Sequence, residues 1–152
     1  MATLIIETRF GQLAVTEQDG AITRLTWGDT AEGEPSALLL AAKAQVQAYD
    51  AGELQAFDLP LRVIGSSFQQ AVCAEMRAIP HGETRTYGEI ARALGQPAQA
   101  VGRACGSNPI PILIPCHRVM GAGGKLTGFS GGTGVETKVA LLRHEGAGGF
   151  LI

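Results

Sequence analysis

A cysteine and a histidine stand side by side at positions 116 and 117, directly after the apolar run Ile110 to Pro115. This run, ended by a proline, predicts a strand-like segment that presents the cysteine at a site. Free cysteine has a pKa of about 8.5, so a thiol that attacks carbon needs a neighbouring base or a positive dipole. His117 is the obvious base, directly or through a water molecule. The alternative is a buried cysteine at a strand end beside an exposed histidine.

Composition limits the class of protein that carries this pair. The chain has 152 residues, of which 45% are hydrophobic, so it can bury one real core. No apolar stretch reaches the roughly 18 residues of a membrane span, and the first residues lack the features of a signal peptide. Cys73, Cys105 and Cys116 cannot all pair, and they lack the CxxC spacing of a zinc or redox site. We therefore expect a globular cytoplasmic protein with reduced thiols, no metal, no cofactor and no membrane partner.

Charge is distributed unevenly along the chain. Up to Leu59 there are three basic and nine acidic residues, which gives −6, whereas from Pro60 onward nine basic residues face five acidic ones, which gives +4. The second half is thus the one suited to a polyanion. Such asymmetry also occurs in proteins that bind no nucleic acid, so it favours a nucleic-acid partner only weakly.

The first half has the pattern of a small sheet covered by a helix. Strands are predicted over Thr3 to Glu7, Leu13 to Glu17 and Ala21 to Trp27, with turn signals between them. Apolar residues at helical spacing predict an amphipathic helix from Pro35 to Tyr49. Leu54 to Val63 is a plausible extra strand and linker, and we place a domain boundary near Pro60, where the charge changes.

The second half is predicted to be mainly helical, which makes the fold class α+β. Ser66-Ser67 can cap a helix from Phe68 to about Ala78, with Cys73 in the core, and Thr86 can cap another from Tyr87 to Leu94. Gly95 ends that helix, and Pro97 can start a third that runs through Cys105. Two helices joined by a short glycine turn form a helix-turn-helix pattern. The third helix has small residues that would let its backbone approach a minor groove, although a tightly packed core pair explains them equally well: Ala98, Ala100, Gly102 and Ala104.

Several motifs together resemble those of the O6-alkylguanine-DNA alkyltransferases. The most specific is the run from Asn108 to Val119, followed by Leu126 to Gly132 and Leu141 to Gly146. The similarity extends upstream through the stretches 68–69, 79–84 and 86–91, and in outline to the N-terminal sheet. The resemblance implies an N-terminal α/β (RNase H-like) domain over residues 1–60 and a DNA-binding, alkyl-acceptor domain over residues 61–152.

The resemblance also implies a reaction and a role for each matching residue. Cys116 would attack the alkyl carbon on guanine O6 in double-stranded DNA and keep the alkyl group, so that one protein repairs one lesion. His117 would be a water-mediated base, and Glu145 would orient that histidine. Asn108 would tie the recognition helix to the active-site segment, where the alternative is a plain Asn-Pro turn. Whether O4-alkylthymine is repaired, how bulky an alkyl group is accepted and whether monomers cooperate on DNA stay open.

The lesion lies inside a duplex, so the nucleotide has to be rotated out into a pocket. By resemblance, Tyr87 crowds the target phosphate and donates a proton as the guanine leaves. Val119, Phe129, Ser130 and Lys138 match pocket positions, with a slightly long spacing before Lys138. Without the resemblance, Tyr87 would be a helix-start residue and Lys138 a solvated charge.

One position departs from the family pattern. Gln99 stands where relatives usually have the arginine that fills the space of the flipped base. Glutamine can still wedge into the duplex, but it lacks the charge that favours entry into a groove. Arg103, four residues on and on the same helical face, could compensate or contact a phosphate.

Other function classes fit less well. A binding-only alkyltransferase-like protein would replace the nucleophile, whereas Cys116 stands in an intact Pro-Cys-His-Arg context. A cysteine hydrolase would need an oxyanion hole and turnover, and nothing in the sequence indicates a carbonyl substrate. A regulatory version would carry a four-cysteine zinc module that this chain lacks.

Overall fold

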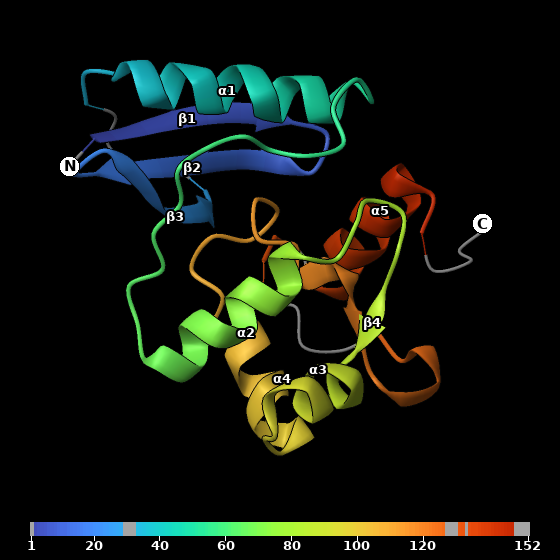
Figure 1. The fold of residues 1–152 in the computed structure, drawn as a ribbon. Coiled ribbons are helices and arrows are strands. Elements are labelled where there is room, and N and C mark those ends of the chain that lie inside the picture. The colour runs from blue at the N-terminus through green and yellow to red at the C-terminus, as the bar shows by residue number, and fades with distance from the viewer. Residues whose placement is uncertain (1, 29–32, 127–130, 133, 148–152) are drawn as a thin grey trace.

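The computed structural model describes residues 2–28, 33–126, 131–132 and 134–147. The chain forms a three-stranded sheet with helix α1 (Ala37–Asp50) along it, and a mainly helical region follows in the chain (Figure 1). This arrangement confirms the predicted α+β class. Buried apolar residues from both regions belong to one continuous core, so the sheet and the helices support the same site.

The sheet is antiparallel, with the order β1-β2-β3. Its strands are β1 (Ala2–Thr8), β2 (Gly11–Gln18) and β3 (Ala21–Trp27), which confirms all three predicted strands. Asp19 and Gly20 join β2 to β3 with φ values of 50° and 81°. Positive φ at both central residues is typical of the tight turns that match strand twist, which explains the Asp-Gly sequence.

Helix α1 (Ala37–Asp50) covers one face of this sheet (Figure 1). It starts two residues later than predicted because Ser36 is its N-cap and accepts a hydrogen bond from the Leu39 amide. Leu39, Ala42 and Val46 are buried on its inner face, and Tyr49 is buried at its last turn. The helix therefore delivers one aromatic residue to the border with the helical region.

The extra strand predicted within Leu54 to Val63 is wrong. This segment makes an isolated bridge to β3, in which the Ile22 amide donates to Pro60 O and the Arg62 amide donates to Ile22 O, both at 2.9 Å. Pro60 has no amide hydrogen, so a regular ladder cannot continue through it. The segment connects the two regions as an extended linker.

Three helices follow and agree closely with prediction. They are α2 (Ser67–Arg77), α3 (Tyr87–Leu94) and α4 (Ala98–Gly106). The Thr86 hydroxyl accepts from the Glu89 amide, and the Glu89 carboxylate accepts from the Thr86 amide, which completes a capping box on α3. Gly95 ends α3 in the left-handed conformation, and α3 and α4 pack against each other as the predicted helix-turn-helix.

The apolar run before Cys116 is not a strand, which corrects the prediction. Its backbone turns back on itself with an isolated bridge between Pro111 and Ile114, and Ile112 has a φ of 72°. Prolines at both ends of the run remove ladder donors, so a strand cannot form. The chain then enters the short 3-10 helix η1 (Cys116–Arg118) and strand β5 (Val119–Met120), which pairs in parallel with β4 (Arg85–Thr86).

The last helix, α5 (Val135–Glu145), was not predicted as a separate element. It follows the short 3-10 helix η2 (Ala122–Gly124) and ends at Gly146, which has a left-handed φ of 69°. Leu141 and Leu142 are buried in its last turns, and this apolar pair before a glycine was the available signal. Among the described residues, no helix combines the length and the apolar character that a membrane span requires.

The capping box gives a first testable prediction, because it fixes the start of the helix that carries Tyr87. Thr86→Ala should lower the free energy of unfolding by about 1 kcal/mol, since the Glu89 amide loses its acceptor, the Thr86 hydroxyl. Urea unfolding followed by circular dichroism measures this loss. Thr86→Ser keeps the hydroxyl and should stay within about 0.5 kcal/mol of the wild type; an equal loss in both variants would contradict the capping role.

Candidate active site

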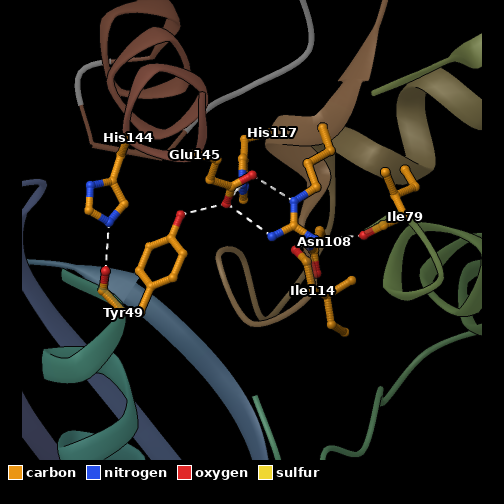
Figure 2. Close-up of polar contacts among 8 residues, drawn as sticks. Tyr49, Ile79, Asn108, Ile114, His117, His144 and Glu145 are labelled. Atoms are coloured by element: carbon orange, nitrogen blue, oxygen red, sulfur yellow. Dashed lines mark hydrogen bonds and ion pairs between the residues drawn. The ribbon is translucent and has the colours of Figure 1, made fainter. Parts of the chain in front are cut away.

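The carboxylate of Glu145, at the end of α5, collects hydrogen bonds from three other side chains (Figure 2). His117 Nε2 lies 2.8 Å from Oε2, and the Tyr49 hydroxyl donates to the same oxygen at 2.6 Å. Arg118 donates from Nε to Oε1 at 2.8 Å and from its second terminal nitrogen to Oε2 at 3.0 Å. One buried carboxylate thus connects α5, η1 and α1.

This cluster is charged in spite of its burial. Burial alone would raise the pKa of Glu145, but the hydrogen bonds from His117 and Arg118 outweigh it and hold that pKa far below its usual range. Arg118 also donates to Ile79 O at 2.6 Å, which satisfies the guanidinium on its other side. Burial and the adjacent carboxylate raise the pKa of Tyr49, so its hydroxyl stays a donor.

His117 is held so that one ring nitrogen remains available as a base. Its side chain is fully buried, and the bond to the ionised Glu145 places the proton on Nε2. Burial lowers the pKa of His117, although Glu145 opposes this shift, so the ring is neutral near pH 7. Nδ1 is buried without a hydrogen-bond partner among the described residues, so its lone pair can accept a proton.

Cys116 begins η1 and is 6% exposed. Burial raises the pKa of its thiol to about 11, while the Asn108 side chain and the positive charge of Lys138 oppose this shift. The thiol is therefore protonated at neutral pH and needs a base to become a nucleophile. The alternative of a buried cysteine beside an exposed histidine is wrong, because His117 is buried as well.

Asn108 clamps the turn that precedes the cysteine. Its amide nitrogen donates to Ile114 O at 2.8 Å, and its amide oxygen accepts from the Ile110 amide at 3.0 Å. Both bonds run from the end of α4 to the backbone of the active-site segment. These two bonds correspond to the link between helix and site that the resemblance implies.

Lys138 is fully buried rather than a solvated charge. Its Nζ donates to Val119 O at 2.5 Å and lies 5.9 Å from the centre of the Tyr87 ring. Burial lowers the pKa of Lys138 to about 8, with Cys116 opposing the shift. Lys138, Val119 and Tyr87 therefore lie together. Phe129 and Ser130, which were also predicted to line the pocket, lie outside the described residues.

A cavity of about 360 Å³ opens beside Cys116. It lies between the end of β3, the end of α4 and the segment after Ser130, and among the described residues that line it none is charged. The lining consists of Leu25, Thr26, Trp27, Cys105, Gly106, Asn108, Pro111, Cys116, Gly131 and Gly132. Such a space accepts an uncharged group next to the sulfur.

Helix α4 turns its small residues and one cation outward. Ala98, Gln99 and Arg103 are exposed, Ala100 and Gly102 are half-buried, and a Cβ on Gly102 would meet open space. Ala104 is instead buried, so the small residues serve both of the functions that the sequence left open. The exposed face of α4 is apart from the cavity lining but joined to it through Asn108.

Three residues with a place in the site were missed in the sequence. Tyr49 was assigned to the helix core, and Arg118 stood in the Pro-Cys-His-Arg motif without a role, yet both bind Glu145. Trp27 was assigned only to a strand. Cys73 is buried, as predicted, and Cys105 is buried as well. Within the described part of the chain, no group of three histidine, cysteine or acidic side chains could hold a metal ion.

Comparison with known proteins agrees with this geometry. A family model described as the DNA binding domain of 6-O-methylguanine DNA methyltransferase matches residues 67–147. The chain is 44% identical over 149 residues to a methylated-DNA–protein-cysteine methyltransferase from Mycolicibacterium paratuberculosis, covering 92% of this chain and 89% of that protein. A constitutive protein of the same name from Bacillus subtilis is 41% identical, with 91% and 92% covered.

Solved structures are similar over nearly the same length. The Mycobacterium tuberculosis O6-methylguanine methyltransferase superposes with a TM-score of 0.85 at 42% identity, covering 95% of this chain and 92% of that one. Mycobacterium tuberculosis OGT in complex with DNA superposes with a TM-score of 0.83 at 43% identity, with 93% and 91% covered.

The carboxylate cluster gives a second prediction. Glu145→Gln should lower the free energy of unfolding by about 3 to 5 kcal/mol, because Arg118 would be left buried without its counter-ion. Glu75→Gln is the matched control, since Glu75 pairs with Arg85 at 3.2 Å on the surface and should cost less than about 1 kcal/mol. Urea unfolding measures both, and equal losses would contradict the central place of Glu145.

The same variant predicts a dependence on pH. A carboxylate whose pKa is lowered by folding stabilises the protein above its ordinary pKa, and this contribution is lost as the pH falls through the folded value. The difference in stability between wild type and Glu145→Gln should therefore be constant above about pH 4.5, the ordinary value for glutamate, and narrow below it. A difference that widens in acid would contradict this sign.

Proposed function

The chain belongs to the 6-O-methylguanine DNA methyltransferase family, and we propose that Cys116 is the residue that takes the alkyl group from guanine O6 in duplex DNA. The protein binds DNA and repairs it by alkyl transfer. The observation that supports Cys116 is its place beside a buried histidine whose far nitrogen is fixed by a buried carboxylate. This order of nucleophile, base and orienting carboxylate is the arrangement that activates a weak nucleophile.

The transfer is a displacement at carbon. The thiol proton moves through one water molecule to Nδ1 of His117, the sulfur forms a bond to the alkyl carbon, and the bond from that carbon to O6 breaks with its electron pair staying on guanine. Glu145 stabilises the positive charge that His117 acquires. The product is a thioether, which has no good leaving group, so the cysteine is not regenerated and one protein molecule repairs one lesion.

Guanine leaves more easily as a neutral base than as an anion. Tyr87 is the proposed donor of that proton, and its position at the start of α3, beside buried Lys138, supports this role. Val119 and Lys138 would line the pocket of the flipped base, since Lys138 Nζ holds Val119 O and so fixes the backbone there. Phe129 and Ser130 are assigned to this pocket by resemblance alone.

The exposed face of α4 is the proposed contact with the minor groove. Small side chains at Ala98, Ala100 and Gly102 let the helix backbone approach the duplex, and Arg103 can bind a phosphate. Gln99, also exposed, would fill the space left by the flipped base. We propose action as a monomer; a cytoplasmic location stays a prediction, and whether copies cooperate on DNA stays open.

The alternative, a protein that binds lesions without removing them, is not favoured. Cys116, His117 and Glu145 are all present, and His117 and Glu145 are hydrogen-bonded.

Acceptance of the alkyl group is tested by intact mass. After incubation with a duplex that carries one O6-methylguanine, the wild type should gain one methyl group, at no more than one per molecule, and peptide mapping should place it on Cys116. Cys116→Ser should gain none. Cys105→Ser is the matched control, because Cys105 lines the same cavity while burial raises its pKa to about 12, and it should still gain one. DNA binding by the wild type without any mass change would support the lesion-binding alternative instead.

Gln99 gives a further prediction. Gln99→Arg should tighten DNA binding and make the dependence of log Kd on log salt concentration steeper by about one unit, because one more phosphate is neutralised. Faster repair should accompany it, since the charge favours entry into the groove. Gln47→Arg, an exposed change on α1, controls for charge alone. Fluorescence anisotropy at several salt concentrations measures the slope; identical slopes and repair rates for Gln99→Arg and wild type would contradict the wedge role.

A further inference from the structure

Trp27 separates two hollows at the end of β3. One is the cavity of about 360 Å³ that contains Cys116 in its lining. The other, of about 440 Å³, is lined among others by Phe10, Thr137 and Ala140. Trp27 and Gly132 belong to both linings, so the indole and this glycine form the wall between the two spaces.

The indole is fixed in this position from two sides. Its Nε1 donates to Phe10 O at 2.9 Å, which anchors the ring to the β1–β2 turn. Its six-membered ring lies against Gly131, where an added Cβ would overlap the ring carbons, and a Cβ on Gly132 would come within 3.1 Å of Nε1. The two glycines let the ring lie directly against the backbone. A ring held this firmly acts as a fixed wall, because it cannot swing away at low cost.

The position of the attacked carbon next to Cys116 determines which part of the substrate can reach the Trp27 indole. The carbon under attack must touch Cys116 Sγ, so the rest of the alkyl group extends into space next to the sulfur. The cavity beside Cys116 offers that space, bounded by the apolar side chains of Leu25, Trp27 and Pro111. An aliphatic or arylmethyl group fits such a lining better than a charged one.

We propose that Trp27 is a specificity-determining residue that limits the length of the O6-alkyl group transferred to Cys116. This inference rests on the function proposed above. Methyl and benzyl groups fit on the Cys116 side of the wall, whereas a benzyl group extended by a second ring meets the indole. Removing the indole joins the two hollows and gives the longer group room to lie over Thr137 and Ala140.

Single-turnover transfer from three duplexes tests the proposal. They carry O6-methylguanine, O6-benzylguanine or O6-(4-phenylbenzyl)guanine, and the mass of the alkylated protein is followed with time. Trp27→Ala should raise the rate for phenylbenzyl relative to that for methyl at least about tenfold over the wild type, the size of effect that a few buried carbon atoms have on selectivity. Trp27→Phe keeps an apolar ring without the Nε1 donor and should show a smaller rise.

Phe68→Ala is the matched control, since it removes an aromatic side chain from α2 that lines neither hollow. Its ratio of phenylbenzyl to methyl transfer rates should equal that of the wild type. An unchanged ratio in Trp27→Ala, with methyl transfer retained, overturns the proposal. If that variant does not fold, Trp27→Leu is measured, and an unchanged ratio there overturns it equally. A wild type that accepts no methyl group contradicts the proposed function instead, so the two failures are distinct.

Discussion

The buried carboxylate of Glu145 is the interaction on which the rest of the structure depends. Four donor groups from three side chains converge on it, one side chain from helix α1 and two from η1. Arg118 also donates to the backbone just after α2, at Ile79 O. A buried charge is tolerated only when its hydrogen bonds are complete. The same bonds that hold His117 in one tautomer therefore also hold the N-terminal and C-terminal regions together, and catalytic geometry and fold stability cannot be separated here.

Burial of Cys116 has two opposite effects on its thiol, protection and loss of reactivity. A buried thiol is protected from oxidation and from solvent, but its pKa rises to about 11 and it is unreactive by itself. In the proposed mechanism the neighbouring neutral histidine is the base that takes the thiol proton. Lys138, whose pKa burial lowers to about 8, carries a positive charge that opposes the rise in the pKa of Cys116.

Local signals predicted much of this molecule. The Asp19-Gly20 turn, the Ser66 and Thr86 caps and the glycine after α3 act within a few residues, so their elements lie where the sequence placed them. Interactions between distant segments could not be read in this way. Tyr49 lies 96 positions from Glu145 and resembles any core aromatic, and the run before Cys116 has strand composition, although the Asn108 clamp and its prolines fold it into a turn. His117 was indicated as a base by its position beside Cys116, whereas the role of Glu145 came from the resemblance alone.

The turn at Ile112 has a consequence for the whole active-site segment. A buried, β-branched residue at a φ of 72° stores conformational strain of about 1 to 3 kcal/mol, and it persists only where its surroundings leave the chain no alternative. The sulfur is therefore positioned by a strained loop that the hydrogen bonds of Asn108 hold in place, rather than by a regular helix or strand. Loss of these hydrogen bonds would let the loop relax to an unstrained conformation and move the sulfur. The exact position of the sulfur therefore depends on the bonds of Asn108.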